Sequence, residues 1–246
     1  SKNKENSSIF GIFDGHSGYE VASFLSTNYS KYFAKEILKI KMTTNYLENC
    51  KNFTLATKKS FEEIDDNIMK NKNIKDDVGS TGTIVFLYKD LYLPTQTKRM
   101  VICANVGDSK GYLIKKNEII QITKDHNCKD KIEVERIKKK GGVVFQGRVF
   151  GSLMLTRSFG DKEMKKYGVL ATPDCYSKQI DEDDLFIIIA SDGVWDVISQ
   201  DDLFNMSKIK MSSDEFSKKI IKTAKERETR DNVSCIVIKL NIDNNK

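Results

Sequence analysis

The chain has 246 residues, of which 39% are hydrophobic and 9% aromatic, so it can bury a sizeable core and is not a disordered chain. Its net charge of +6 arises from 41 Lys and Arg against 35 Asp and Glu. No compact basic block with interleaved aromatic residues occurs, and no apolar run is long enough for a membrane span, which argues against a nucleic-acid-binding module and an integral membrane protein.

The cysteines are odd in number, scattered, and not spaced as metal ligands. They are Cys50, Cys103, Cys128, Cys175 and Cys235. This usage is typical of a reducing compartment and predicts a cytoplasmic or nuclear protein. Because the first residue is Ser1 and not Met, we expect the sequence to be a fragment of a longer protein.

The N-terminal third predicts one strand followed by two helices. After a polar segment, residues 1–8, an apolar run over 9–13 is typical of a buried strand. Apolar residues at every fourth position over 21–37 predict a helix with one buried face. A second helix is predicted from about residue 54 to 70, followed by a charged connection over 71–77.

The middle of the chain changes to a β pattern. Short β-branched runs separated by turn residues predict four strands, over 81–88, 99–106, 111–115 and 119–123. Residues 89–98 contain Pro94 and are expected to form a hairpin loop.

The C-terminal half mixes both kinds of element. A charged helix over 130–140 is expected to end at Gly141-Gly142. The elements expected after it are a hairpin over 143–149, strands over 176–180 and 185–190, helices over 201–208 and 213–227, and a strand over 233–240. This order predicts an α+β fold in which helices cover a sandwich of strands, with one domain over 9–240 and a polar tail over 241–246.

Three aspartates stand next to predicted strands and turns. Asp14 and Asp192 each follow an apolar strand and precede a glycine, and Asp231 comes just before the last strand. Carboxylates placed rigidly at strand ends are suitable ligands for a hard divalent cation, and Mg²⁺ or Mn²⁺ fits better than zinc because no cysteine lies nearby. The alternative is that each aspartate only caps a turn.

His16 follows Asp14-Gly15, and it is one of only two histidines in the chain. A histidine beside such carboxylates suggests proton transfer. The alternative is an ordinary Asp-Gly turn in which the histidine has no chemical role.

Other kinds of phosphate chemistry can be tested by spacing. A cysteine-based phosphatase needs an arginine six positions after its cysteine, but the residues found there are Ala56, Ser109, Val134, Asp181 and Asn241. There is also no Gly-x-x-x-x-Gly-Lys loop for nucleotide phosphates and no Gly-x-Ser-x-Gly elbow. Covalent cysteine catalysis is therefore excluded.

An ordered set of motifs resembles one known family over residues 9–239. The motifs are Phe13-Asp14-Gly15-His16-Ser17-Gly18, Gly79-Ser80-Thr81-Gly82, Asn105-Val106-Gly107-Asp108-Ser109, Asp125-His126, Glu135-Arg136-Ile137 with Gly141-Gly142, Thr156-Arg157-Ser158-Phe159-Gly160-Asp161, Pro173-Asp174, Ala190-Ser191-Asp192-Gly193-Val194-Trp195-Asp196 and Arg230-Asp231-Asn232. They resemble the metal-dependent Ser/Thr protein phosphatases of type 2C (the PPM family). The resemblance implies a four-layer α-β-β-α sandwich of two mainly antiparallel sheets flanked by helices.

The resemblance also implies a site. Asp14 would bridge two Mg²⁺ or Mn²⁺ ions, the Gly15 carbonyl would bind the second ion, and Asp192 and Asp231 would complete the first ion's shell. Asp125 would hold a third, weaker ion together with Asp192.

The chemistry implied by the resemblance is hydrolysis of phosphoserine and phosphothreonine in proteins. A bridging hydroxide activated by the metal ions would attack phosphorus without a phosphoenzyme, and His16 would be the general acid. The partners would be phosphorylated proteins, and the protein is expected to be a monomer.

Several other residues of these motifs are expected to be structural. His126 would order a loop, Asp108 would serve a tight turn or support the metal ligands, and Trp195 would lie in the core. Arg136, Arg157 and Asp161 would belong to buried polar networks.

The sequence departs from the family at its start. The family carries an N-terminal strand pair with an Arg that binds phosphate and a Glu that binds the second metal, whereas only eight polar residues precede Ile9, and Glu5 has the wrong context. The fold is therefore expected to lack this strand pair. The alternative function is a pseudophosphatase, a binding or scaffold module that keeps the fold with little or no turnover.

Overall fold

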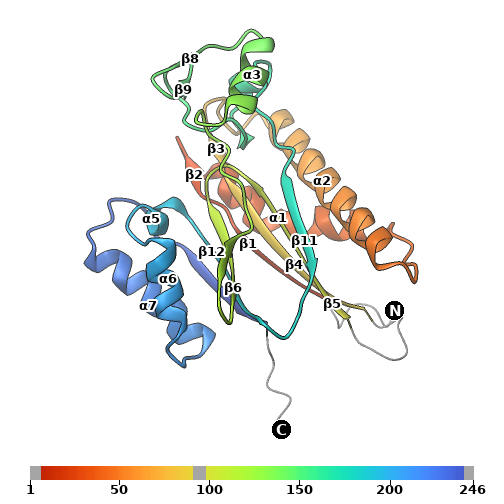
Figure 1. Cartoon of the computed structure of the whole chain (residues 1–246). Coiled ribbons are helices and arrows are strands. Elements are labelled where there is room, and N and C mark those ends of the chain that lie inside the picture. Colours follow the sequence, from red (N-terminus) through yellow and green to blue (C-terminus); the bar gives the residue numbers. More distant parts are fainter. Residues whose placement is uncertain (1–6, 91–97, 241–246) are drawn as a thin grey trace.

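The computed structural model describes residues 7–90 and 98–240 (Figure 1). The helices are α1 (Glu20–Ile37), α2 (Tyr46–Lys70), α3 (Lys131–Lys139), α4 (Lys162–Lys165), α5 (Asp192–Trp195), α6 (Gln200–Ser207) and α7 (Ser213–Glu226). The strands are β1 (Ser7–Ile12), β2 (Gly15–His16), β3 (Gly79–Ser80), β4 (Gly82–Asp90), β5 (Lys98–Val106), β6 (Lys110–Lys115), β7 (Ile119–Gln121), β8 (Val144–Phe145), β9 (Arg148–Val149), β10 (Phe159–Gly160), β11 (Asp174–Gln179), β12 (Asp184–Ala190) and β13 (Cys235–Lys239).

Two larger sheets form the centre of the molecule. One has the strand order β1-β4-β5-β11 and the other β13-β12-β6-β7, and a small third sheet has the order β10-β3-β2. Every pairing between named strands of the described residues is antiparallel. The α+β class and the antiparallel sheets predicted from the sequence are confirmed.

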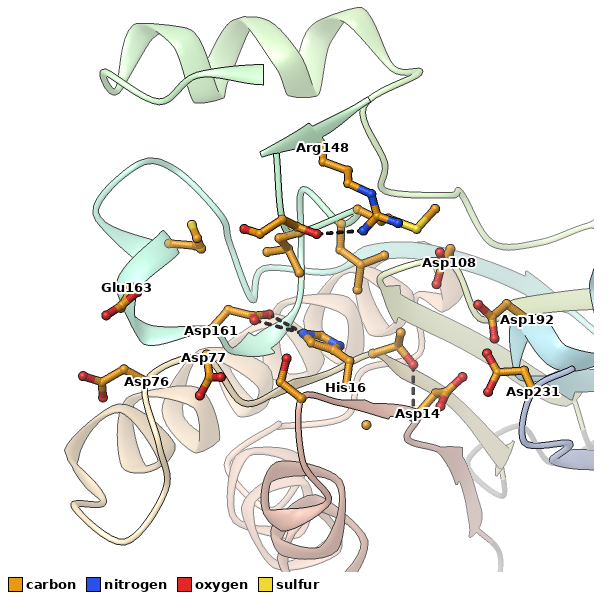
Figure 2. Close-up of a pocket in the computed structure, with 18 residues that line it drawn as sticks. Asp14, His16, Asp76, Asp77, Asp108, Arg148, Asp161, Glu163, Asp192 and Asp231 are labelled. Carbon is orange, nitrogen blue, oxygen red and sulfur yellow. Dashed lines mark hydrogen bonds and ion pairs between the residues drawn. The ribbon is translucent and has the colours of Figure 1, made fainter. Parts of the chain in front are cut away.

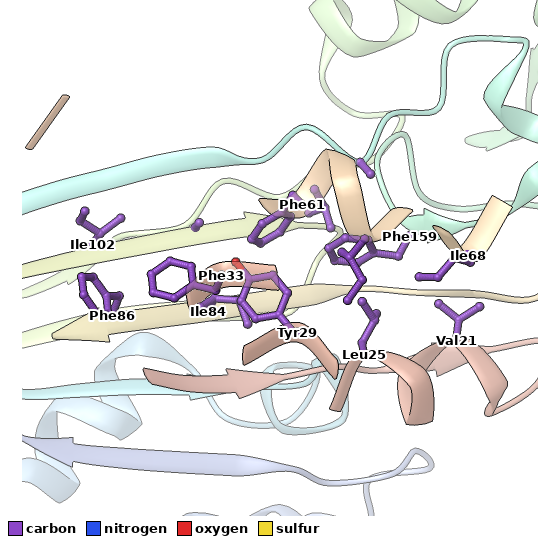
Figure 3. Close-up of a cluster of buried hydrophobic side chains, with 14 of the residues drawn as sticks. Val21, Leu25, Tyr29, Phe33, Phe61, Ile68, Ile84, Phe86, Ile102 and Phe159 are labelled. Atoms are coloured by element: carbon purple, nitrogen blue, oxygen red, sulfur yellow. The ribbon is translucent and has the colours of Figure 1, made fainter. Parts of the chain in front are cut away.

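Helices α1 and α2 pack on the first sheet through aromatic and branched side chains (Figure 3). The four-residue apolar repeat of α1 places Val21, Leu25, Tyr29 and Phe33 on the buried face. The Tyr29 hydroxyl lies 3.0 Å from the Ser60 hydroxyl of α2, so this buried polar group has a partner.

Two further clusters lie beyond the first sheet. One fills the space between the two larger sheets, where Val85 and Cys103 of the first meet Leu113 and Ile187 of the second. The other side of the second sheet packs against α6 and α7, with Phe216 buried among its members. Figure 1 shows α5, α6 and α7 on the side of the sheets away from α2.

Some predicted bounds differ from the structure. Helix α2 begins at Tyr46, eight residues before the predicted start, because the Asn45 side chain caps it by accepting hydrogen bonds from the backbone N–H of Leu47 and Glu48. The short helices α4 and α5 were not predicted, since four residues carry no periodic signal. The predicted loop over 89–98 is a connection between the paired strands β4 and β5, but its residues 91–97 lie outside the described residues, as do 1–6 and 241–246.

Two observations concern the predictions made from the sequence about membrane spans and cysteines. None of the helices in the described part of the chain has the length and hydrophobicity that a membrane crossing needs. All five cysteines are free thiols.

A buried ion network fixes α3 to the loop that precedes β10. Glu133 is 1% exposed and accepts hydrogen bonds from Arg157 and from the Thr156 hydroxyl, and Arg136 also pairs with it. Burial alone would raise the pKa of Glu133, but the bonds from Arg157 and Arg136 outweigh it and lower the pKa to about 2. Arg136 and Arg157 thus belong to a buried network, as the sequence predicted.

We expect Glu133→Gln to lower the free energy of unfolding at neutral pH by about 3 kcal/mol, because it takes the buried anion from the partly buried Arg136 and removes one of the two carboxylates that pair with Arg157. Chemical denaturation measures this change, and the exposed Glu135→Gln is the matched control, with an expected change within about 0.5 kcal/mol. Since the pKa of Glu133 is lowered in the folded state, the difference between wild type and Glu133→Gln should shrink as the pH falls from 4.5 towards about 2. A difference that does not depend on pH in this range would contradict the assignment.

Candidate metal centre

A cavity of about 460 Å³ opens at the end of the sheets where the predicted site residues meet (Figure 2). Asp14, Gly15, His16, Asp192 and Asp231 all line it, although they come from segments far apart in the sequence. The acidic side chains along its wall are Asp14, Asp76, Asp77, Asp108, Asp161, Glu163, Asp192 and Asp231. Arg148 is the one Lys or Arg side chain among its described lining residues.

Backbone hydrogen bonds to the Gly79-Ser80-Thr81-Gly82 motif hold Asp14. The Asp14 N–H donates to the Thr81 hydroxyl at 3.2 Å, and the Thr81 N–H donates to the Asp14 carbonyl at 2.8 Å. The Ser80 hydroxyl also donates to this carbonyl at 3.1 Å, and the Thr81 hydroxyl lies 2.8 Å from that of Ser109. These bonds fix the main chain of Asp14 and do not engage its carboxylate.

Asp192 and Asp231 are held together by the residues next to them. The Ser191 hydroxyl donates to the Asn232 carbonyl at 3.2 Å. Gly193 packs so closely on the same carbonyl that a Cβ atom added there would lie 2.2 Å from the Asn232 oxygen. A glycine is therefore needed after Asp192 for the two segments to approach each other.

The cavity holds more negative charge than its surroundings compensate. Burial and the nearby carboxylates of Asp192 and Asp231 raise the pKa of Asp14 to about 7. Burial and Asp192 likewise raise the pKa of Asp108 to about 6. Burial, opposed in part by a bond with Asp14 and reinforced by the charge of Asp231, raises the pKa of Asp192. A cation placed among these groups would remove the repulsion.

The chemistry of this cluster fits a hard divalent cation. The buried Oδ1 of Asp192 has no hydrogen-bond partner, which leaves it available as a ligand. Carboxylate and carbonyl oxygens are the ligands that Mg²⁺ and Mn²⁺ prefer. As the side chains lie, no three Asp, Glu, His or Cys residues within 7–90 and 98–240 form a ready set of metal ligands, so the carboxylates would have to close around an ion.

Asp125, the predicted ligand of a third ion, is not among the lining residues of the cavity. Its carboxylate lies 3.1 Å from the Lys110 ammonium and accepts a hydrogen bond from the Gln121 side chain at 3.0 Å. Its charge still contributes to the raised pKa of Asp108. The structure therefore places Asp125 beside the acidic cluster with its charge already paired.

Asp108 was predicted to serve a turn, yet it lines the cavity together with Asp14 and Asp192. The sequence feature that could have identified Asp108 is the one used for Asp14 and Asp192, an aspartate that follows a strand and stands next to a glycine. Asp108 follows the C-terminal end of strand β5 and stands next to Gly107, whose φ of +94° makes the turn.

His16 contacts Asp161, which sequence reasoning had assigned to a buried polar network only. The His16 Nε2 atom lies 2.9 Å from both carboxylate oxygens of Asp161. Burial would lower the pKa of His16, but its bond to Asp161 and the charge of that group outweigh burial and raise the pKa. His16 is thus held at the cavity wall by a carboxylate outside the predicted ligand set.

The second histidine lies away from the cavity wall. His126 is fully buried, its Nε2 lies 3.1 Å from Asp174, and its carbonyl accepts a bond from the Thr156 N–H. These bonds tie together three loops, as expected for a residue that orders a loop.

Trp195 is partly buried; its Nε1 donates to the Ala190 carbonyl and its ring packs on Tyr112.

Comparisons with known proteins show the family of the chain. The family model "Protein phosphatase 2C" matches residues 1–233. The chain is 32% identical over 241 residues to "Probable protein phosphatase 2C 52" of Oryza sativa subsp. japonica, and 30% identical over 234 residues to "Probable protein phosphatase 2C 45" of the same organism. These alignments cover 96% and 94% of the chain, and 45% and 76% of the two rice proteins.

Solved structures share the fold. The "Structure of a C.elegans sex determining protein" superposes with a TM-score of 0.78 at 26% identity, covering 95% of this chain and 56% of that one. The "Crystal structure of serine-threonine phosphatase 2C from Toxoplasma gondii" superposes with a TM-score of 0.75 at 20% identity, covering 96% and 85%. The chain thus spans about half the length of some relatives and most of others. Since the family model covers nearly all of it and the motifs of that family line its cavity, the chain belongs to the protein phosphatase 2C family of metal-dependent Ser/Thr protein phosphatases.

Proposed function

We propose that the protein hydrolyses phosphoserine and phosphothreonine in phosphorylated proteins, without a covalent phosphoenzyme. The observation that carries this proposal is the meeting of Asp14, Asp192 and Asp231 in one cavity with their charges uncompensated. A folded protein gains no stability from such a cluster, so its presence is best explained by a bound cation and an anionic substrate.

Asp14, the Gly15 carbonyl, Asp192 and Asp231 are the groups that would hold two Mg²⁺ or Mn²⁺ ions. When bound, the ions would supply an activated water and neutralise the negative charge of the phosphoryl group. Asp108, which lies within the same cluster, is better placed to contribute to a third ion than Asp125, because Lys110 already pairs with Asp125. The protein's own contribution is to fix these oxygens before the substrate arrives.

His16 is the group that would complete the reaction. Attack of water on phosphorus breaks the bond to the serine or threonine oxygen, and this oxygen needs a proton as it leaves. His16 lies in the cavity wall two residues after Asp14, and its raised pKa favours the protonated ring. A proton from the imidazolium would go to the leaving oxygen and leave a neutral ring.

The finer description of the fold belongs to this proposal. The clusters between α1–α2 and the first sheet, between the two larger sheets, and between the second sheet and α6–α7 support a four-layer α-β-β-α sandwich. The expected lack of the family's N-terminal strand pair, the boundaries of the domain and a monomeric state stay predictions. A scaffold without turnover is the alternative, and it gives no reason to retain the repelling carboxylates.

The first test is catalytic. We expect the full-length protein to release phosphate from a phosphothreonine peptide with Mn²⁺ and not with a chelator, and Asp192→Ala to reduce this activity by ~1,000-fold or more, because it removes a ligand oxygen and an anchor for charge in the transition state. A malachite-green phosphate assay measures the rate. Equal turnover in wild type and Asp192→Ala, or in chelator, would exclude the metal-dependent mechanism.

The second test measures metal binding without turnover. In chelator, Asp192→Asn should raise the free energy of unfolding by about 1 kcal/mol and the melting temperature by about 2–4 °C, because it relieves repulsion with Asp14 and Asp231. In Mn²⁺ the order should reverse, since wild type gains more from binding the ion. Differential scanning fluorimetry checks both, with the exposed Asp201→Asn as the control that should follow wild type. Identical Mn²⁺ shifts in wild type and Asp192→Asn would argue against the site.

The third test concerns the proton donor. We expect His16→Gln to slow hydrolysis of the phosphothreonine peptide by ~100-fold or more, but to slow that of 4-nitrophenyl phosphate far less, because nitrophenolate leaves without a proton. Steady-state kinetics on both substrates measure the ratio. An equal loss on both substrates would remove His16 from this role.

A further inference from the structure

We propose that Asp161 is the positioning residue of His16, and that its bond to Nε2 assigns Nδ1 as the atom that delivers the proton to the leaving oxygen. The proposal rests on the proposed function, since it concerns the same reaction. It assigns a role to a buried carboxylate that the metal chemistry does not use.

The contacts of the pair fix which nitrogen is engaged. The His16 Nε2 atom lies 2.9 Å from Oδ1 and 2.9 Å from Oδ2 of Asp161, whose side chain is only 4% exposed. An ionised carboxylate can only accept hydrogen bonds, so Nε2 must carry a hydrogen in this arrangement. The neutral ring is then the Nε2–H tautomer, and Nδ1 is the nitrogen that can exchange a proton with substrate.

The small sheet β10-β3-β2 is built to bring the two side chains together. His16 of β2 pairs with Gly79 of β3, and Gly79 pairs with Gly160 of β10, directly before Asp161. The pair therefore closes over the central glycine. A Cβ atom added to Gly79 would lie 2.3 Å from the Asp161 Oδ2 and 2.4 Å from the His16 Nε2. Any other residue at this position would separate them.

Asp161 is itself rigidly held. Its backbone has a φ of +46°, in the left-handed region that Asp and Asn tolerate better than most residues. Its N–H donates to the Val78 carbonyl at 3.0 Å, and the Ser158 hydroxyl donates to its Oδ2. On the other side, the Gly160 N–H donates to the Asp65 carboxylate at 2.8 Å. A carboxylate fixed by this many bonds can fix the ring that it binds.

The position of the pair suits a proton donor. Figure 2 shows Asp161 on one side of the His16 ring and Asp14, Asp108, Asp192 and Asp231 on the other. The proton leaves Nδ1 and passes to the oxygen freed when the phosphorus–oxygen bond breaks, while the Nε2 hydrogen stays on the bond to Asp161. Asp161 neither gives nor takes a proton in this step, so it acts only through His16.

The kinetic experiment compares Asp161→Asn with wild type in the full-length protein. Asn is tolerated at the positive φ, but its amide can donate to Nε2 and so favour the wrong tautomer. We expect kcat on a phosphothreonine peptide to fall by ~100-fold or more, with KM changed by less than about threefold and with a much smaller loss on 4-nitrophenyl phosphate. In His16→Gln/Asp161→Asn the two losses should not multiply, since both variants remove the same function.

Two further variants separate positioning from stability. Asp184→Asn is the control, because Asp184 is also fully buried and ion-paired, with Lys178, but lies outside the cavity lining; it should show the same loss, if any, on both substrates. Gly79→Ala leaves both charged groups in the protein and pushes them apart, so it should reproduce the selective loss on the peptide substrate.

A spectroscopic measurement does not depend on turnover. Long-range ¹H–¹⁵N correlation spectra report the tautomer of each imidazole, and the chain has only two histidines, so His16→Gln assigns both signals. We expect the neutral His16 ring to carry its hydrogen on Nε2 in the metal-free wild type and to lose this preference in Asp161→Asn, while His126 is unchanged.

The outcomes distinguish this proposal from the proposed function. Full-length wild-type protein that releases no phosphate from either substrate would overturn the function. Activity with an equal loss on both substrates in Asp161→Asn, or a wild-type His16 ring protonated on Nδ1, would overturn the role of Asp161 alone.

Discussion

The cavity depends on holding several like-charged carboxylates close together. Burial and the charges of Asp192 and Asp231 raise the pKa of Asp14 to about 7, so charge repulsion opposes the approach of these side chains. The approach is imposed by neighbouring main-chain bonds: Thr81 fixes Asp14 from both its N–H and its hydroxyl, and Ser191 ties the Asp192 segment to Asn232. The apolar layers supply the free energy that holds this arrangement, because their buried aliphatic and aromatic side chains far outnumber the repelling carboxylates.

The antiparallel order of the strands decides where the carboxylates meet. Strands β1 and β5 both pair with β4, so they run in the same direction and end together, which brings Asp14 and Asp108 to one end of the first sheet. Strand β12 pairs antiparallel with β13, so the end of one lies beside the start of the other, and Asp192 meets the segment of Asp231. Strand β6 starts opposite the end of β12, with Lys110 across from Ala190, so the short turn around Asp108 joins the same ends of both sheets.

This topology explains how far the sequence could be interpreted. The strands and most helices were predictable because their apolar periods are local, and Asp14, Asp192 and Asp231 were recognisable because each lies beside a strand end. The motif that contains Asp161 was visible, but its contact with His16 joins positions that are 145 apart in the sequence and depends on a central glycine in a sheet of two-residue strands. Strands of two residues are too short to show an alternating hydrophobic pattern in the sequence. The pairing of Asp125 with Lys110 is likewise a contact between the loop after β7 and strand β6, and it leaves no pattern in the sequence.

The small sheet connects the two sides of the proposed reaction. Strand β2 carries His16 and begins one residue after Asp14, while the next residue of β3 after Gly79 is Ser80, whose hydroxyl bonds the Asp14 carbonyl. One central strand therefore fixes both the carboxylate that would face the attacking water and the imidazole that would face the leaving oxygen. In-line displacement at phosphorus requires these two groups to keep a constant separation, because water enters opposite the oxygen that leaves. A displacement of β3 would disturb both groups at once. This is a physical reason why position 79 is a glycine, which has no side chain, and why many hydrogen bonds surround it.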